Sequence, residues 1–274
     1  MTRKYETVLV TGASSGMGKD IASRLLEEGY TVYAAARSVG KMDDLAARGA
    51  IVLAMDITKN DQVEAAVNRI LEERGGVDVL VNNAGYGQYG PVEDTPIDTA
   101  RYQFEVNLFG LARLTQLLIP AMRDRNKGLI VNISSMGGKI FTPLGAWYHA
   151  TKYALEGWSD CLRLELKDFG IDVVIVEPGI IRTGFADALT ERFALKENSA
   201  YAALAEKMRK ASEESYSGGS GSPPSVISDV VVEAMAARRP RTRYAAGAMA
   251  KPLIFLRWLV SDRIFDRLVM SQVS

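Results

Sequence analysis

The chain has 274 residues, of which 47% are apolar, and this is enough to bury a large core within a single α/β unit. Lysine plus arginine and aspartate plus glutamate number 33 each, so the formal net charge is zero and the general attraction of a duplex-binding protein to nucleic acid is excluded. One cysteine and one histidine exclude an internal disulfide and leave too few ligands for a typical zinc site, so we expect no metal.

The first residues lead directly into a strand-like segment and lack the apolar region of a signal peptide. No uninterrupted apolar run reaches the roughly 18 residues that a membrane-spanning helix needs. A lone cysteine is typical of a reducing compartment. Together these features predict a cytoplasmic protein without a spanning segment.

The first predicted strand, Thr7–Thr11, is followed by a glycine-rich turn and by an amphipathic helix that ends near Gly29. Gly12, Gly16 and Gly18 allow a tight turn and a close approach of the backbone, so that a diphosphate can bind the free N–H groups of the helix. The spacing differs from the common Gly-x-Gly-x-x-Gly pattern. An ordinary glycine-rich turn is the alternative interpretation.

The second predicted strand, Thr31–Ala36, ends at Arg37 and precedes a short helix over 41–47. In dinucleotide-binding folds an acidic residue at the end of this strand binds the adenosine ribose, whereas an arginine accommodates a 2′-phosphate. Here the strand end has a guanidinium and no carboxylate, which favours NADP(H) over NAD(H). A solvated loop arginine is the alternative.

Strands and helices continue to alternate along the chain. The next predicted elements are strands over 51–56, 77–81, 128–135 and 171–176 and helices over 61–74, 96–122 and from about 146 to 169. This alternation predicts a Rossmann-type, doubly wound parallel sheet with helices on both faces and with ligands at the carboxyl ends of the strands. Asp56 and Asn83 lie at such ends. A helix cap for Asp56 and a simple turn role for Asn83 are the alternatives.

Tyr148 and Lys152 lie four residues apart in a predicted helix, so they share one helical face. A tyrosine with a pKa of about 10 exchanges protons poorly near neutral pH unless a nearby positive charge stabilises its phenolate. With such help it can exchange a proton with a carbonyl or alcohol oxygen while hydride moves at the neighbouring carbon. The alternative is a chance pairing of an exposed tyrosine and a solvated lysine.

Six motifs, in this order, resemble the short-chain dehydrogenase/reductase family: Thr11-Gly12-x-x-x-Gly16-x-Gly18, Asn82-Asn83-Ala84-Gly85, Asn107, Ser135, Tyr148-x-x-x-Lys152 and Pro178-Gly179. The glycine spacing fits the single-domain branch, in which the chain is similar to hydroxysteroid and retinol dehydrogenase-like enzymes. Met17 stands where isoleucine is frequent. Ser15 replaces a basic residue that is common in NADP-preferring members, so the predicted preference depends on Arg37.

The resemblance implies four catalytic residues. Tyr148 is the general acid and base, and Lys152 orients the nicotinamide ribose and tunes the phenol. Ser135 donates a hydrogen bond to the substrate oxygen, where charge develops during the reaction. Asn107 distorts its helix and keeps a water in the proton relay to the lysine.

The resemblance also implies the contacts of the cofactor, with the diphosphate on the glycines and adenine at Asp56. The adenosine side lies at Asn83, and Ile181 and Thr183 meet the nicotinamide carboxamide. The full predicted set is Gly12, Ser14, Ser15, Gly16, Met17, Gly18, Arg37, Asp56, Ile57, Asn83, Ala84, Gly85, Tyr148, Lys152, Pro178, Gly179, Ile181 and Thr183.

Substrate is expected over Ser135 and Tyr148, walled by mostly apolar or aromatic side chains. The predicted wall residues are Tyr86, Gln88, Met136, Phe141, Leu144, Trp147 and Phe185. Such walls suit a lipid-like, steroid-like or retinoid-like carbonyl, although several could belong to the core instead. His149 points about 100° away from Tyr148 on an ideal helix. We interpret His149 and Cys161 as packing residues.

The regular alternation ends after Thr183. Residues 184–228 combine a helical run with a Gly-, Ser- and Pro-rich stretch, which predicts a mobile substrate lid. A helix over 225–237 and a strand over 241–246 complete a seven-stranded sheet, and residues 1–274 are expected to form one catalytic domain. For the amphipathic segment 252–270 four roles stay open: docking on the subunit, covering the pocket, an oligomer contact, or lying on a membrane surface.

The sequence therefore predicts an NADP(H)-dependent oxidoreductase that interconverts a ketone or aldehyde and an alcohol on a hydrophobic substrate. We expect a homodimer or homotetramer without a nucleic-acid partner. One alternative is a non-catalytic NADP-binding sensor or scaffold that kept the fold. Another is a peripheral membrane enzyme that reduces lipid carbonyls and makes membrane contact through the C-terminal segment.

Overall fold

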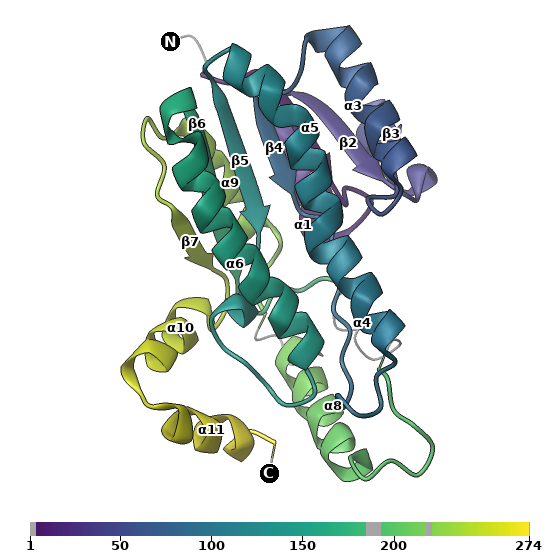
Figure 1. Cartoon of the computed structure of the whole chain (residues 1–274), viewed down its shortest axis with the longest axis vertical. Helices are drawn as coiled ribbons and strands as arrows, with labels where there is room; N and C mark the ends of the chain where they lie inside the picture. Colours follow the sequence, from purple (N-terminus) through teal and green to yellow (C-terminus); the bar gives the residue numbers. More distant parts are fainter. Residues whose placement is uncertain (1–3, 185–192, 218–220, 274) are drawn as a thin grey trace.

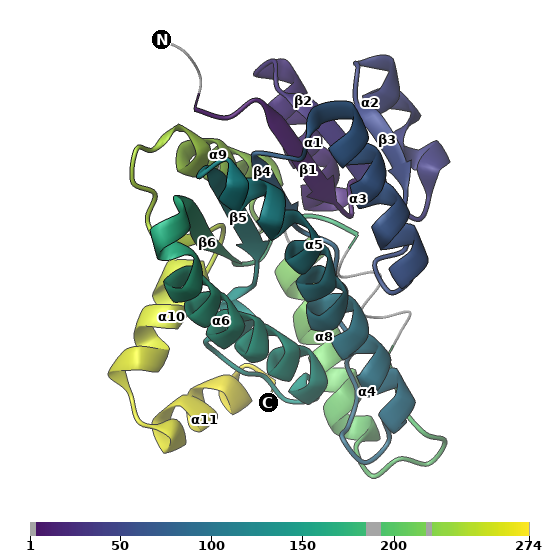
Figure 2. The same ribbon diagram turned by 45° about the horizontal axis from the view of Figure 1, so that its top comes forward.

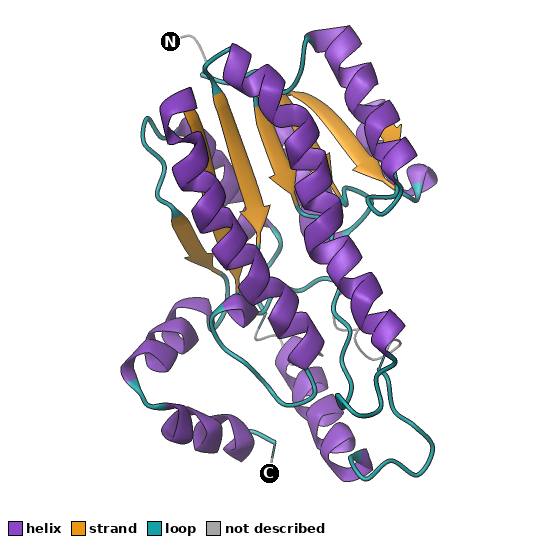
Figure 3. Ribbon diagram, viewed as in Figure 1, coloured by secondary structure: helices purple, strands orange, loops and turns teal. Residues whose placement is uncertain are grey.

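The computed structural model describes residues 4–184, 193–217 and 221–273 (Figure 1). One sheet of seven parallel strands has the order β3-β2-β1-β4-β5-β6-β7, which confirms the predicted Rossmann-type architecture (Figure 3). The strands are β1 Thr7–Thr11, β2 Thr31–Ala36, β3 Ile51–Ala54, β4 Val79–Asn82, β5 Gly128–Ile133, β6 Ile171–Pro178 and β7 Arg243–Ala246.

Helices connect the strands and cover the sheet. They are α1 Gly16–Glu27, α2 Asp43–Ala47, α3 Asn60–Arg74, α4 Ile97–Phe104, α5 Gly110–Asp124, α6 Ala146–Leu166, α8 Ala202–Ser217, α9 Ser225–Ala236, α10 Ala250–Leu259 and α11 Asp262–Ser271. Shorter helical turns are η1 Val39–Met42, the π-helical η2 Glu105–Phe109, η3 Met136–Gly138 and η4 Lys167–Phe169. Helix α6 and its short continuation η4 end at Gly170, which adopts the left-handed conformation that favours glycine.

Two apolar clusters fill the space between the sheet and its helices. Successive strand residues point to opposite faces, so Val8 and Val10 join one cluster with residues of α1 and α9, and Leu9 joins the other. The second cluster contains residues of α3, α5 and α6, the helices that cover the other face of the sheet in Figures 1 and 2. Burial on both faces explains why the strands are nearly continuous apolar runs.

Three strand ends differ from the prediction because side chains and neighbouring strands set them. Strand β3 ends at Ala54, which leaves Asp56 in the following loop. Strand β5 ends at Ile133, and Ser135 instead caps η3 by accepting a hydrogen bond from the Gly137 amide. Strand β6 continues through Pro178, because β7 pairs with its last residues.

The predicted C-terminal amphipathic segment consists of two helices, α10 and α11. Backbone at Val260 and Ser261 is extended, and this break turns the chain between the helices. Among the described residues no helix has both the length and the apolar character to cross a membrane. The packing role assigned to Cys161 was wrong, since its place on α6 leaves it exposed.

Candidate active site

A groove of about 330 Å³ lies at the carboxyl ends of the strands on the β1 side of the sheet. It contains most of the residues predicted to contact the cofactor: Gly12, Ser14, Ser15, Gly16, Met17, Arg37, Asp56, Ile57, Asn83, Ala84, Gly85 and Thr183. These residues follow the ends of five strands, β1, β2, β3, β4 and β6. The parallel topology therefore brings them together as the alternation of elements predicted.

The glycine turn between β1 and α1 has the geometry of an anion cradle. Gly12 and Gly16 have φ values of 68° and 53°, in the region that side chains disfavour. Helix α1 has no side-chain cap at Ser15 and no acidic residue in its first turn, so its free N–H groups can receive a diphosphate. Gly18 does not line the groove. A Cβ there would lie 2.3 Å from Asn83 Nδ2, so Gly18 permits close packing of the turn.

Arg37 and Asp56 border the far end of the groove. Arg37 is exposed just after β2, and no ion pair engages it within the described ranges. Asp56 Oδ1 accepts hydrogen bonds from the amide and hydroxyl of Thr58, at 3.0 and 2.9 Å. Asp56 thus shapes its own loop while lining the groove. It does not cap α3, whose N-cap residue is Lys59.

Asn83 ties the end of β4 to the end of β1. Its side-chain amide donates to the carbonyl of Thr11 at 2.9 Å, and the Thr11 hydroxyl accepts from the Asn83 and Ala84 amides at 3.1 and 3.0 Å. These bonds fix the glycine turn against β4. Asn83 is therefore a structural strand-end residue that also borders the groove.

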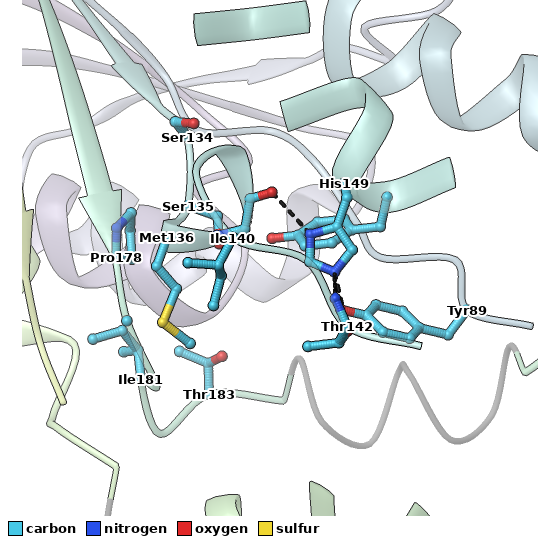
Figure 4. A pocket seen from close by; sticks show the side chains of 13 residues that line it. Tyr89, Ser134, Ser135, Met136, Ile140, Thr142, His149, Pro178, Ile181 and Thr183 are labelled. Carbon is cyan, nitrogen blue, oxygen red and sulfur yellow. Dashed lines mark hydrogen bonds between the residues drawn. The ribbon is translucent and has the colours of Figure 1, made fainter. Parts of the chain in front are cut away.

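A second, smaller cavity of about 110 Å³ lies beside the groove (Figure 4). Ser135 and Tyr148 both line it, together with Pro178, Gly179 and Ile181. Thr183 lines both cavities. The structure thus brings the predicted proton donor and carbonyl anchor together with the residues predicted on the nicotinamide side.

Lys152 lies behind this cavity rather than in its wall. Helix α6 buries its side chain, and Nζ donates to the carbonyl of Ile133 at the end of β5, at 2.9 Å. Burial lowers the pKa of Lys152 to about 8, and the nearby charge of Glu156 only partly opposes this effect. The ammonium therefore releases its proton more readily than an ordinary lysine.

Asn107 occupies the π-helical turn η2 between α4 and α5. Its Oδ1 accepts from the amide of Tyr86 at 3.0 Å, and its Nδ2 donates to the carbonyl of Tyr86 at 2.9 Å and to the hydroxyl of Thr151 at 3.1 Å. These bonds satisfy a fully buried amide within an apolar stretch. A helix distortion is present at this residue. Asn107 lines neither cavity and joins the loop after β4 to α6.

His149 lines the Tyr148 cavity, contrary to the prediction that it packs away from the site. The helical offset suggested that His149 turns elsewhere, but the loop after η3 folds back over α6 and encloses both rings, whose centroids lie 5.7 Å apart. Its Nδ1 lies 2.8 Å from the carbonyl of Gly137, and its Nε2 lies 3.1 Å from the amide of Thr142 (Figure 4). The predicted burial of this side chain is confirmed.

Most predicted wall residues lie elsewhere. Met136 lines the small cavity, Tyr86 lines the groove, and Phe141 packs against Phe265 with ring centroids 5.2 Å apart. Gln88, Leu144 and Trp147 line neither cavity, and Phe185 falls outside the described residues. The small cavity is also lined by residues that were not predicted as part of the site: Tyr89, Ser134, Gly137, Ile140, Thr142 and His149. Tyr89 was detectable as a further aromatic in the loop after the fourth strand.

The described part of the predicted lid includes a segment that is bonded to the loop after β4. The amide of Ala194 donates to the carbonyl of Tyr89 at 2.9 Å. Further along, Lys196 Nζ donates to the carbonyl of Glu93 at 2.9 Å, and the hydroxyl of Tyr201 donates to Glu93 at 3.0 Å. These bonds hold the segment against the loop that carries Tyr89, a wall residue of the small cavity. Residues 185–192 and 218–220 of the predicted lid lie outside the described residues.

Comparison with known proteins gives consistent matches. A family model described as short chain dehydrogenase matches residues 6–193. A 3-ketodihydrosphingosine reductase of Bacteroides thetaiotaomicron is 39% identical over 186 residues, which is 66% of each chain. An uncharacterised oxidoreductase of Escherichia coli strain K12 is 33% identical over 269 residues, covering 97% of this chain and 94% of its own.

Solved structures agree over nearly the whole chain. A short-chain dehydrogenase from Streptomyces avermitilis is 34% identical with a TM-score of 0.82, covering 98% of this chain and 96% of its own. Two further structures are 25% identical: a Burkholderia phymatum enzyme in complex with NAD (TM-score 0.77, covering 93% and 92%) and a Burkholderia cenocepacia enzyme in complex with NADP (TM-score 0.75, covering 100% of both). Similar proteins thus hold either nicotinamide coenzyme.

Proposed function

The chain belongs to the short-chain dehydrogenase/reductase family, as an NAD(P)-dependent oxidoreductase acting on CH–OH groups, and on that premise we propose that it reduces a hydrophobic ketone or aldehyde with NADPH. The observation that carries this proposal is the placement of Ser135 and Tyr148 in one cavity that meets the dinucleotide groove at Thr183. A carbonyl in that cavity would face a hydroxyl donor, a phenol and the nicotinamide end of the groove.

The chain's own residues supply the proton and the orientation. NADPH, when bound, supplies the hydride for the carbonyl carbon. Tyr148 gives its phenolic proton to the carbonyl oxygen, and Ser135 donates a hydrogen bond that stabilises the developing negative charge. Lys152 stands one helical turn behind the phenol. Its readily lost proton suits it to resupply Tyr148.

The cavity walls support a hydrophobic substrate. Tyr89, Met136, Ile140 and Ile181 line the cavity around Tyr148. Apolar walls with a few convergent polar groups favour a substrate that is mostly hydrocarbon around one carbonyl. The relative from Bacteroides thetaiotaomicron is named for a keto derivative of dihydrosphingosine. A long-chain ketone of the sphingoid type is therefore the first substrate to test.

We infer a preference for NADPH from the end of β2. Arg37 lines the groove at the place where an acidic residue would bind the unphosphorylated ribose. The neighbouring groove residue, Ser38, is also not acidic. A 2′-phosphate would meet a guanidinium that no ion pair engages within the described residues.

A Tyr148→Phe variant tests the proposed proton donor. Loss of NADPH absorbance is followed with long-chain ketones, steroid ketones and retinal. We expect turnover by the wild type and a drop of roughly 10² to 10⁴-fold in kcat/KM for the variant, because general acid catalysis is removed while the ring remains. Coenzyme binding, measured by NADPH fluorescence, should change far less than kcat/KM, because Tyr148 is one of many predicted coenzyme contacts.

Tyr153 offers a matched control on the same helix. Its ring is partly exposed, its hydroxyl donates to the carbonyl of Lys139, and it lines neither cavity. Tyr153→Phe should retain wild-type kcat/KM. Full activity in Tyr148→Phe, or no turnover of any carbonyl by a wild type that binds NADPH, would contradict the proposal.

A further inference from the structure

Helices α10 and α11 form an arm at one edge of the molecule, beyond the residues 6–193 that match the family model (Figures 1 and 2). The arm exposes large apolar side chains to an unusual degree. On α10, Phe255 is 60% exposed, Trp258 78% and Leu259 61%. On α11, Ile264 is 46% exposed and Leu268 42%. Exposed apolar groups that are gathered in this way mark an interaction surface.

Helical spacing arranges these side chains in stripes flanked by cations. On α10, Phe255 and Leu259 are four residues apart and Trp258 lies between them, so the three share one face. Lys251 lies one turn before Phe255 on that face. The rings of Phe255 and Trp258 pack together, with centroids 5.9 Å apart, and thus form one continuous aromatic surface.

Helix α11 repeats the pattern. Ile264 and Leu268 form an apolar stripe, and Arg263 and Arg267 form a parallel stripe one residue behind it. Within the described chain, Lys251, Arg263 and Arg267 are exposed and take part in no ion pair. The arm thus presents unpaired positive charge beside exposed apolar surface.

A different set of contacts fixes the arm to the body. Arg257 pairs with Asp262 at 2.6 Å and lies over the rings of Phe141 and Phe265, 5.4 and 5.5 Å from their centroids. Phe265 is fully buried and packs edge-on against Phe141. The apolar and cationic stripes are therefore not needed to hold the arm in place.

We propose that this arm docks on an anionic lipid bilayer. Tryptophan and phenylalanine enter the interfacial region of a bilayer, aliphatic side chains bury beside them, and flanking lysine and arginine reach the lipid headgroups. A second copy fits this surface less well. A twofold interface would gather two copies of the same unpaired cations in one contact, and bringing like charges together in this way is unfavourable.

The position of the arm gives the docking a consequence for the active site. Phe141, which anchors Phe265, follows Ile140 and precedes Thr142, and both of these line the small cavity. A docked arm therefore holds the border of the cavity near the lipid surface, from which a hydrophobic carbonyl can enter. This second step rests on the proposed function, whereas the docking itself does not.

Vesicle co-sedimentation of the full chain tests the proposal. The probes are vesicles of phosphatidylcholine alone and of an equal mixture of phosphatidylcholine and phosphatidylserine. We expect binding to the mixed vesicles and much weaker binding to the neutral ones. Phe255→Ser with Trp258→Ser should lower partitioning by at least about tenfold. Arg263→Glu with Arg267→Glu should lower it by about fivefold or more, because each cation near the surface contributes.

Matched controls separate docking from general surface effects. Leu164→Ser removes a side chain on α6 that is 69% exposed, and Arg238→Glu reverses an exposed charge before β7; both should bind like the wild type. NADPH-dependent turnover of a water-soluble carbonyl without vesicles should be equal in all variants. This assay tests the proposed function independently of vesicle binding, so failure of the one can be distinguished from failure of the other. Equal binding of the arm variants and the wild type would overturn the proposal. So would a wild type that ignores vesicles and instead self-associates through Trp258.

Discussion

His149 shows how one buried side chain can position two parts of the site. The backbone amide of Thr142 can only donate, so Nε2 of His149 must accept, and Nδ1 must carry the hydrogen that it donates to the carbonyl of Gly137. The same ring fills space that a Cβ at Gly145 would enter, at 2.7 Å from its Cδ2. The neutral ring therefore fastens the loop after Ser135 to the helix that carries Tyr148.

Stability in mild acid should depend on His149. Burial lowers the pKa of its ring below the ordinary value of 6.5. Below about pH 6.5 the unfolded chain binds a proton that the folded chain resists, so the free energy of unfolding falls as pH falls towards the lowered pKa. Asparagine does not titrate in this range. In His149→Asn, the free energy of unfolding measured with urea should therefore depend less on pH than in the wild type. It should also be less stable at neutral pH by about 1–3 kcal/mol, because the Thr142 amide loses its acceptor.

The same variant separates positioning from chemistry. In His149→Asn we expect a lower kcat, since the loop that carries the Ser135 anchor is less fixed, with unchanged NADPH affinity. A wild-type kcat together with an unchanged pH dependence of stability would show that the ring only fills space.

Arg37 determines the expected coenzyme choice. Arg37→Ala should lower kcat/KM for NADPH by about 10 to 100-fold and leave that for NADH nearly unchanged, because a charge-assisted bond to the 2′-phosphate is lost. Steady-state kinetics with both coenzymes measure this ratio. Arg238→Ala, which removes an exposed arginine before β7, is the control. Equal loss with both coenzymes would assign Arg37 a structural role instead.

At the scale of elements, a buried charge cluster joins α6, β6 and β7 behind the site. Glu156 of α6 accepts from Lys139 at 2.8 Å and from Arg243 of β7 at 3.1 Å. Glu177 of β6 lies 3.5 Å from the same guanidinium. Burial raises the pKa of Glu177 to about 7, and the adjacent charge of Glu156 adds to this effect. Glu177 therefore shares the Arg243 guanidinium with Glu156 and has no cation of its own among the described residues.

Glu177→Gln should make stability less sensitive to pH. Between the ordinary glutamate pKa of about 4.3 and the value of about 7 in the fold, the folded chain holds a proton that the unfolded chain has lost. The wild type therefore loses stability as pH rises through this window, by at most about 4 kcal/mol. Thermal unfolding across the window should show a smaller loss in Glu177→Gln. Glu165→Gln, on the exposed face of α6, should behave like the wild type.

At the scale of the whole molecule, local sequence predicted the fold because each element carried its own signal. The β-branched run at Thr7–Thr11 and the glycines at 12, 16 and 18 give strand, turn and helix without distant contacts. Parallel crossovers then place the strand ends together, which is why the predicted groove residues meet. The single domain, the cytoplasmic location and the homo-oligomer stay predictions.

What the sequence did not predict depends on contacts between distant segments. β6 continues through Pro178 because β7 pairs with it, and His149 lines the cavity because a loop folds over its helix. The predicted wall residue Phe141 lines neither cavity for the same reason, because it packs against Phe265, more than a hundred residues later in the chain. Helical offset and composition carry no information on such partners.

Thr183 belongs to the walls of both cavities, and this shared wall bears on the order of events in catalysis. A coenzyme whose nicotinamide end was held at Thr183 would form part of the surface that binds the carbonyl compound. Without the coenzyme, this part of the substrate-binding surface would be absent. Kinetics should then be compulsory-order, with the dinucleotide entering ahead of its co-substrate and leaving last.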